Sequence, residues 1–425
     1  MKNSLDWTNK IDANKIAELA FNIAEEIIIE ISRLNLSIFK KKNLGKDEIS
    51  LILKYPIFVS MNNYIDRLLI ANTKIENNNS INFPFSNKKN KYFENTNLSV
   101  VNYYYSLSIT FNLLNEILFI LDKNYQSKNK ISEKVNLEEV YKKNNNLKKI
   151  KNLVKFFLQK KDEIIFKIFK PKIIMEKNNW QGNLFPFWNI IDFKYHNFND
   201  DNRKIDFENR NLIRKSCKNV FLKNFDKLHI NINDSCKDEI SSLFAKYIDY
   251  SLPISLIEGL NDRFDYYSKF LNNHTLKEIH SFTGLSYDDN FKIFSLISKR
   301  KKANFIVHEH GLSNYTYGIL NCRMATMLKH VDFFCTYGND VDINIQFSRL
   351  NNNKIRVVNL GSNYFNSFKK WNKKRSTSKF TILYPSGPLM QFKTNLQETS
   401  REKCLLNRNK ILIFIDKILK KYKSV

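Results

Sequence analysis

The chain has few cysteines and no pair of them in a C-x-x-C arrangement. Five occur in 425 residues, widely spaced along the chain. An odd number at irregular spacing excludes a disulfide scaffold and argues against a cysteine-based zinc site. We therefore expect a protein of a reducing compartment, the cytoplasm, with no cofactor. The five are Cys217, Cys236, Cys322, Cys335 and Cys404.

Long apolar runs are also missing. The N-terminal segment MKNSLDWTNK is polar and lacks the apolar stretch of a signal peptide. The longest apolar runs, such as Ile117 to Leu121, are far too short to span a bilayer. We expect a soluble protein, or one in peripheral contact with the anionic inner membrane face through its basic surface.

Glycine and proline are scarce, at 9 and 7 residues, whereas 69 Lys and Arg outnumber 42 Asp and Glu to give a net charge of +27. Such a charge indicates an anionic partner, which is nucleic acid, anionic lipid or a phosphorylated substrate. Abundant Lys, Asn, Ile and Phe, with little Gly, Pro and Arg, also fit mutational drift toward A/T-rich codons. The charge alone therefore does not select a function.

The surviving glycines are more informative, because drift should spare those that the backbone requires. Six of the nine glycines and four of the seven histidines fall between residues 280 and 387. We place the function in this stretch. The histidines are His280, His308, His310 and His330.

The first half of the chain has the apolar spacing of helices. The predicted helices cover 13–34, 49–70 (interrupted near Pro56) and 100–123. Residues 128–177 are dense in Lys and Asn, with apolar residues at helical spacing. They indicate either a long helix with a solvated lysine face or a nucleic-acid-binding arm. Residues 180–211 show no period and are interpreted as a loop or insertion.

Short apolar runs alternate with helical segments after about Cys217. This alternation predicts an α/β fold with a parallel sheet flanked by helices, in which ligands bind beyond the carboxyl ends of the strands. The expected strands are 275–282, 303–307, 332–337, 355–360 and 380–384. The expected helices are 286–301, 319–329, 341–350 and 402–422.

The sharpest local signal is the run His308-Glu309-His310-Gly311 at the end of an expected strand. A histidine there can remove a proton from a hydroxyl nucleophile. Glycines permit tight turns, and tyrosines suit carbohydrate recognition. Alternatively, the histidines satisfy a buried loop, or they join His330 and Asp332 at a metal, although the spacing matches no zinc signature. The candidate binding residues of this run are Gly311, Tyr315, Tyr317 and Gly318.

Other catalytic motifs do not occur. The sequence contains no G-x-S-x-G, no G-x-G-x-x-G and no G-x-x-x-x-G-K-[ST]. A serine-hydrolase triad, a dinucleotide fingerprint and a P-loop are therefore not expected.

A resemblance to known proteins rests on several motifs in order. They are LILKYPIFVSMNNYIDRLLIANT, TFNLLNEILF, LPISLIEGL, HEHGLSNYTYG, KHVDFFCTYG and IRVVNLGS. The set resembles a family of surface-carbohydrate transferases with a QHGG-x-YG motif, distantly similar to capsule and teichoic-acid transferases. The resemblance covers about residues 10 to 400. The chain departs from it at Glu309, where the family has Gln, and at Leu312, where the family usually has Gly.

The resemblance implies a GT-B-like glycosyltransferase of surface polysaccharide biosynthesis. A nucleotide-activated sugar and a carbohydrate or lipid-linked acceptor would be its substrates. His310 would be the general base and Gly311 its turn, with His308 and Glu309 beside them. Further binding positions implied by the matching motifs are Tyr317, Gly318, Asp332, Gly338, Gly361 and Ser362.

The same resemblance implies a domain organisation. A mainly helical region with a Lys/Asn-rich insertion covers 1–215, and a Rossmann-like acceptor domain covers 216–361. A linker covers 362–379, and an incomplete donor domain begins at 380 and runs to 425. The alternatives are a truncated, non-catalytic remnant of such a transferase and a basic nucleic-acid-binding protein. The second lacks RNP, KH and zinc-finger signatures, and nucleic acid is not the expected partner.

Overall fold

A computed structural model gives the structure of the chain. It describes residues 10–76, 107–122, 145–177, 186–193, 196, 198, 200, 203–272, 274–309, 328–336, 355–360 and 409–417. Within these residues, no helix is both long enough and apolar enough to cross a membrane.

A six-stranded sheet forms one part of the molecule, and every neighbouring pair of its strands is parallel. The strand order is β2-β1-β3-β4-β5-β6. The predicted α/β fold with a parallel, Rossmann-like sheet is confirmed. The strands are β1 (Ile173–Glu176), β2 (Ile190–Ile191), β3 (Glu278–Ser281), β4 (Asn304–His308), β5 (Phe333–Thr336) and β6 (Arg356–Asn359).

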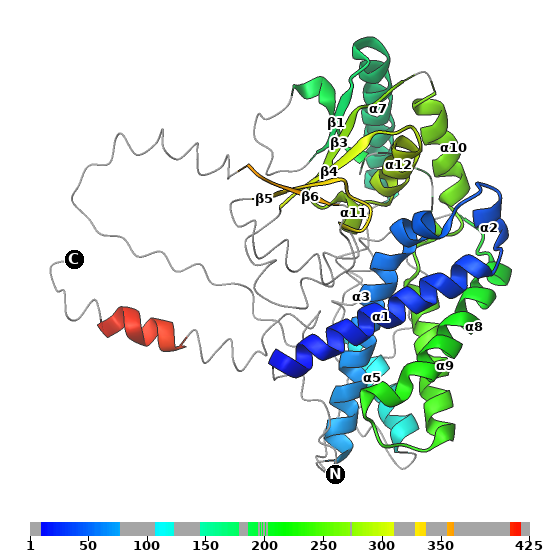
Figure 1. The fold of residues 1–425 in the computed structure, drawn as a ribbon, viewed down its shortest axis with the longest axis vertical. Coiled ribbons are helices and arrows are strands. Elements are labelled where there is room, and N and C mark those ends of the chain that lie inside the picture. The colour runs from blue at the N-terminus through cyan, green and yellow to red at the C-terminus, as the bar shows by residue number, and fades with distance from the viewer. Residues whose placement is uncertain are drawn as a thin grey trace.

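Helices form the second part of the molecule. Five of them pack on one another below the sheet in Figure 1. They are α1 (Lys10–Arg33), α3 (Lys46–Glu76), α5 (Leu107–Leu121), α8 (Phe207–Asn224) and α9 (Asp234–Ser251). Beside the sheet lie α7 (Asn145–Phe169), α10 (Leu260–Phe270) and α12 (Asp289–Arg300). Short elements are α2 (Ser37–Lys40), α11 (Gly284–Tyr287) and the 3-10 turns η1 (Phe187–Asn189), η4 (Phe225–Leu228) and η5 (Ile254–Leu256).

The stripe of apolar residues predicted for the first helix faces the core. Ile16, Ala20, Ile23 and Ile27 recur at intervals of three or four residues and are fully buried in α1. This spacing places them on one face of a helix, which packs against α3 and α8.

The expected interruption near Pro56 does not occur, because α3 continues through the proline. A proline inside a helix costs about 3 kcal/mol. Burial of the adjacent Leu53, Ile57 and Phe58 favours the helix here, at about 2 kcal/mol for each large apolar side chain. The hydroxyl of Ser60 also donates to the Pro56 carbonyl at 2.7 Å.

The long helix expected over 128–177 ends at Phe169, and β1 follows after three residues. Lys170 has a positive φ of 43°, and its N–H donates to the carbonyl of Phe166. Pro171 comes next, and this combination ends a helix. The strand was missed because Ile173 and Ile174 fit the apolar spacing of the helix, although Pro171 interrupts it.

One face of the sheet is closed by α12. Residues aligned in register point to the same side, so Ile279, Phe305 and Phe334 share this face, and all three are fully buried. The ring of Phe291 in α12 lies 5.9 Å from that of Phe305. The predicted helix 286–301 is therefore present as the cover of the sheet.

The remaining expectations divide into two groups. The strands expected at 275–282, 303–307, 332–337 and 355–360 are confirmed, and residues 409–417 are helical within the helix expected at 402–422. The range 180–211 contains β2 and the start of α8. The predicted domain boundary between residues 215 and 216 falls inside α8, and two strands of the sheet, β1 and β2, precede it. The segments 319–327, 341–350, 362–379 and 380–384 lie outside the described residues.

Candidate active site

Two histidines lie side by side near the carboxyl ends of neighbouring strands. Nδ1 of His280, in β3, is 2.9 Å from Nε2 of His308, the last residue of β4. Their rings stack with centroids 5.3 Å apart. The ring of Phe282 stacks on His308 at 5.0 Å, and Oε2 of Glu278 is 3.1 Å from Nε2 of His280. Glu278, His280 and His308 thus form a hydrogen-bonded chain, which we call the Glu–His–His relay.

The relay determines which ring nitrogens carry protons. The carboxylate of Glu278 accepts, so Nε2 of His280 holds the hydrogen that it donates. In neutral His280, Nδ1 is then an acceptor, and Nε2 of His308 must donate to it. Nδ1 of neutral His308 is left with its lone pair. The relay therefore prepares His308 to accept a proton at Nδ1.

Burial keeps both rings neutral. It lowers the pKa of His308 to about 4, and the neighbouring His280 lowers it further. Burial also lowers the pKa of His280, against the opposing effect of the Glu278 carboxylate. At neutral pH His308 is therefore unprotonated and its Nδ1 is free of a proton, while the low pKa weakens the affinity of this nitrogen for the proton that it would accept.

The relay lies on the more open face of the sheet, opposite α12. His280 is aligned with Ile306, and His308 with Cys335, so these residues share a face. Ile306 and His308 are half-buried, whereas the opposite face is closed. His308 is therefore partly exposed on this side.

A second polar group lies at the carboxyl ends of the strands on the closed face. Glu176 ends β1 and is 3% exposed. Its Oε2 accepts hydrogen bonds from the Ser281 hydroxyl at 2.7 Å and from the Gly284 N–H at 2.8 Å. These two hydrogen bonds join the end of β1 to the end of β3 and to the turn after β3. They therefore stabilise the carboxyl ends of the strands, near which the relay lies.

Comparison with known proteins decides the broad class of the chain. The model of the LIC12162 family transferase matches residues 46–425. The chain belongs to the LIC12162 family of transferases. No curated protein and no solved structure matches the chain.

Most of the site residues predicted for this LIC12162 family transferase lie outside the described residues. Only His308, Glu309 and Asp332 can be placed. The others are His310, Gly311, Tyr315, Tyr317, Gly318, Gly338, Gly361 and Ser362, whose roles stay predictions.

The three placed residues are not all together. The N–H of Glu309 donates to the carbonyl of Cys335 at 2.8 Å, and the Glu309 side chain is 1% exposed. Glu309 thus continues the pairing of β4 with β5 beside His308. Asp332 lies at the amino end of β5, where its Oδ2 accepts from the N–H of Phe305 at 2.8 Å. The structure therefore separates Asp332 from His308 by the length of the strands.

The alternative interpretation of the histidine run, a metal site, required His330 and Asp332 as further ligands. His330 is buried, and this burial, followed by nearby lysines, lowers its pKa to about 3. Within the described ranges, no three His, Cys, Asp or Glu side chains are grouped so as to hold a metal ion.

Sequence reasoning missed Glu278 and the partnership of His280 with His308. The signal was available, because Glu278 and His280 are two residues apart in an expected strand and therefore share a face. The missing information was the register, which aligns β3 with β4 so that His280 reaches His308.

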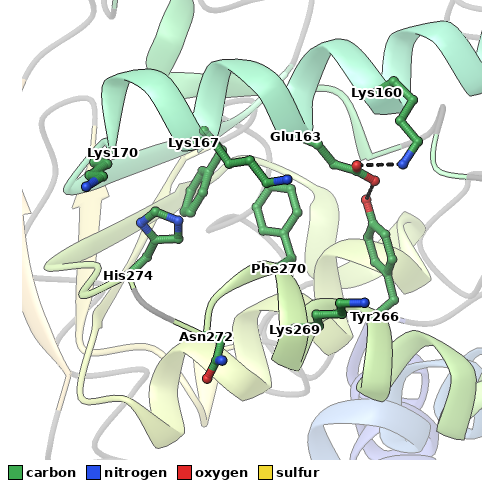
Figure 2. Close-up of a pocket in the computed structure, with 10 residues that line it drawn as sticks. Lys160, Glu163, Lys167, Lys170, Tyr266, Lys269, Phe270, Asn272 and His274 are labelled. Atoms are coloured by element: carbon green, nitrogen blue, oxygen red, sulfur yellow. Dashed lines mark hydrogen bonds and ion pairs between the residues drawn. The ribbon is translucent and has the colours of Figure 1, made fainter.

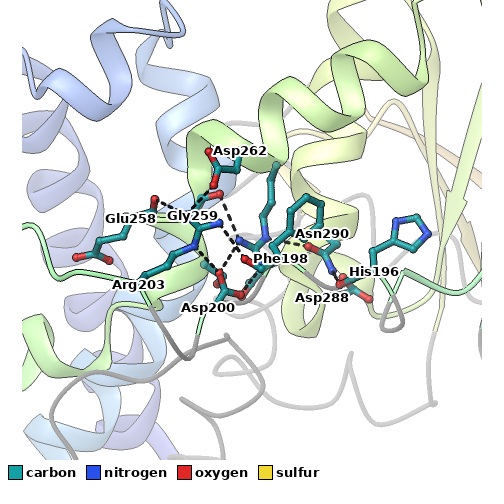
Figure 3. Close-up of polar contacts among 12 residues, drawn as sticks. His196, Phe198, Asp200, Arg203, Glu258, Gly259, Asp262, Asp288 and Asn290 are labelled. Carbon is teal, nitrogen blue, oxygen red and sulfur yellow. Dashed lines mark hydrogen bonds and ion pairs between the residues drawn. The ribbon is translucent and has the colours of Figure 1, made fainter. Parts of the chain in front are cut away.

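The LPISLIEGL segment of the resemblance has a structural role in this family member. After it, in α10, Arg263 donates from Nη1 to Oδ1 of Asp200 at 2.9 Å and from Nε to Asn290 at 2.8 Å. Arg203 donates to the same oxygen of Asp200 at 3.0 Å (Figure 3). A Cβ on Gly259 would lie 3.0 Å from the Ser255 carbonyl oxygen and closer still to Arg263. The glycine therefore lets the two arginines converge.

Proposed function

We propose that the chain is a glycosyltransferase that moves a sugar, or a sugar-phosphate-type group, from a nucleotide-activated donor to a carbohydrate hydroxyl. Membership in a transferase family supports the reaction class. The ordered motifs support carbohydrate chemistry in surface polysaccharide synthesis. The Glu–His–His relay is the observation that carries the proposal, because it supplies a neutral base at the open face of the sheet.

In the proposed step, the proton of the acceptor hydroxyl passes to Nδ1 of His308. The electron pair of that oxygen forms a bond to the anomeric carbon of the donor. The bond from this carbon to the phosphate oxygen breaks, and its electrons leave with the nucleotide. His280 accepts a hydrogen bond from the protonated His308 ring, and the Glu278 carboxylate orients His280. One displacement of this kind inverts the anomeric centre.

The sequence motif favoured His310 as the base, and that assignment stays a prediction. The proposal gives the role to His308 because its partners are known. The two assignments are separated by mutating each histidine alone.

The test measures nucleotide release from a panel of nucleotide sugars, with and without carbohydrate acceptors. We expect His308→Gln to lower kcat by about 100-fold or more, the usual contribution of a general base. His229→Gln is the matched control, since His229 lies on the surface far along the chain from the relay. Full activity in His308→Gln together with loss in His310→Gln would move the base to His310.

Binding is tested separately by thermal unfolding. A nucleotide sugar that binds the folded chain raises its melting temperature. If no nucleotide or nucleotide sugar does so, and no release is detected, the glycosyltransferase proposal is wrong. Retention of oligonucleotides at physiological salt would then favour the nucleic-acid alternative.

A further inference from the structure

One helix turns an apolar stripe away from the protein. In α7, Phe157, Ile164 and Ile168 are 61%, 56% and 66% exposed, whereas Phe166 is 2% exposed. Their spacing of seven and four residues places the first three on one side of the helix, opposite Phe166. The sequence had predicted either a solvated lysine face or a nucleic-acid-binding arm for this segment. An amphipathic helix with its apolar side outward marks an interaction surface.

Aromatic rings extend this stripe beyond the end of the helix. Phe169 stacks on Trp188 with centroids 5.4 Å apart and planes at 11°. The ring of Phe187 packs edge-on against both. All three side chains remain exposed by a third or more of their surface. Trp and Phe at the margin of an apolar surface are typical of segments that lie at the level of lipid headgroups.

The charges of α7 are sorted between its two sides. Its buried Asp162 lies 3.5 Å from Nε2 of His196, and Glu163 accepts from the Tyr266 hydroxyl at 2.9 Å. Both acids therefore face the protein. Lys161 is exposed on the outer side, and it pairs with no acid among the residues that the structure describes. Lys167 is also exposed, but its side chain lines the cavity between α7 and α10. The outward surface is thus apolar and positive.

The space behind the helix is basic as well. A cavity of about 670 Å³ lies between α7 and α10 (Figure 2). Its lining includes Lys160, Lys167, Lys170 and Lys269, against the single acid Glu163. Only Lys160 of the four is paired, with Glu163 at 2.7 Å, as far as the described chain shows. The lysines at the rim add to the positive field around the stripe.

We propose that α7, together with Phe169, Phe187 and Trp188, binds the surface of an anionic bilayer. The helix would lie in the plane of the headgroups with Phe157, Ile164 and Ile168 in the acyl boundary. Lys161 would contact lipid phosphates, and the lysines that line the cavity would add to the attraction of the anionic surface. A second copy of the chain fits this surface less well, because two lysine-rich faces repel one another. Nucleic acid fits less well, because it offers no apolar surface to the three stripe residues.

The experiment uses the full chain and vesicles, without sugar substrates, so its outcome is independent of the proposed transfer reaction. We expect cosedimentation with vesicles of equal parts phosphatidylglycerol and phosphatidylcholine, and little with pure phosphatidylcholine. Phe157→Glu and Ile164→Glu should each weaken binding about tenfold or more, since each places a charge in the apolar boundary. Lys161→Glu should weaken it too, most strongly at low salt.

Matched controls come from α8, where Leu212 and Lys215 are also exposed. Leu212→Glu and Lys215→Glu should bind as the wild type does, and circular dichroism should show every variant to be folded. Equal binding of Phe157→Glu and wild type, or no binding of the wild type to anionic vesicles, would overturn the proposal. A third outcome would also overturn it. In this outcome the wild type does not bind vesicles but forms a dimer or an oligonucleotide complex, and Phe157→Glu abolishes that dimer or complex.

Discussion

The carboxylate of Glu176 accepts a hydrogen bond from the backbone N–H of Gly284, 2.8 Å away, although the two residues are 108 positions apart. This contact joins the end of β1 to the turn that follows β3. It brings the backbone of Gly284 so close to Glu176 that no side chain fits between them.

We therefore expect Gly284→Ala to destabilise the protein by about 1–3 kcal/mol, the usual cost of an overpacked core. An added Cβ would lie 2.5 Å from the Phe291 ring and 2.6 Å from the Glu176 carboxylate oxygen. Chemical unfolding measures the loss. Gly45→Ala is the control, because a Cβ there meets nothing within 4 Å and should change stability by less than about 0.5 kcal/mol. Equal effects of the two substitutions would contradict this account.

A buried ion pair gives a second prediction. Nε of Arg210 lies 2.6 Å from Oε1 of Glu258, and the two side chains are 1% and 4% exposed. Glu258→Gln removes the nearer of two carboxylates at the buried guanidinium, since Oδ1 of Asp249 lies 3.4 Å from its Nη1, and we expect a loss of about 3 kcal/mol in unfolding free energy. Lys218→Ala removes the exposed pair with Asp238 and should cost less than about 1 kcal/mol. A stable Glu258→Gln protein would show that Arg210 is compensated in another way.

The buried histidine His330 predicts how stability depends on pH. Its pKa is about 3 in the folded chain, against an ordinary value of 6.5. Between these values the unfolded chain binds more protons than the folded chain, so stability falls as pH falls below about 6.5. From pH 7.5 to pH 5 this histidine contributes a loss of about 2 kcal/mol.

His330→Leu should remove that part of the pH dependence, whatever its effect on stability at neutral pH. Urea unfolding at the two pH values measures it, with His229→Gln as the control. If the difference in unfolding free energy between pH 7.5 and pH 5 were the same in His330→Leu as in the wild type, His330 would be protonated in the folded chain at pH 5.

The relay predicts a tautomer that can be observed without any substrate. ¹⁵N NMR of the seven histidines should show His308 with its proton on Nε2 and a bare Nδ1 at neutral pH. Glu278→Gln can donate to His280 instead of accepting, which would move the proton of His308 to Nδ1. Its kcat should then fall by about 100-fold, with a smaller change in KM. Glu208→Gln, on the surface of α8, should alter neither the spectrum nor the rate.

Sequence reasoning found four of the six strands of the described sheet, because these depend on local patterns. It named His308 among the candidates but favoured His310, which lies outside the described residues. Alternating apolar runs identify β3 to β6, and His308 directly follows one of them. Glu278 could not be assigned as its indirect partner, since that depends on the register between β3 and β4. The sequence of α7 also does not say which side faces the protein. That choice depends on Phe166 packing against Phe270, a contact between distant parts of the chain.

The pairing of β1 with β3 also has a consequence for synthesis of the chain. Glu176 and Ser281, joined by a hydrogen bond at the end of this pair, are 105 residues apart. A ribosome adding about 5 to 20 residues per second needs about 5 to 20 s to cover that interval. During this time α8 and α9 can pack on the helices already made, and β1 can pair with β2, whereas the other edge of β1 must wait for β3. We expect the helical part to fold first and the open edge of β1 to be the segment that chaperones protect.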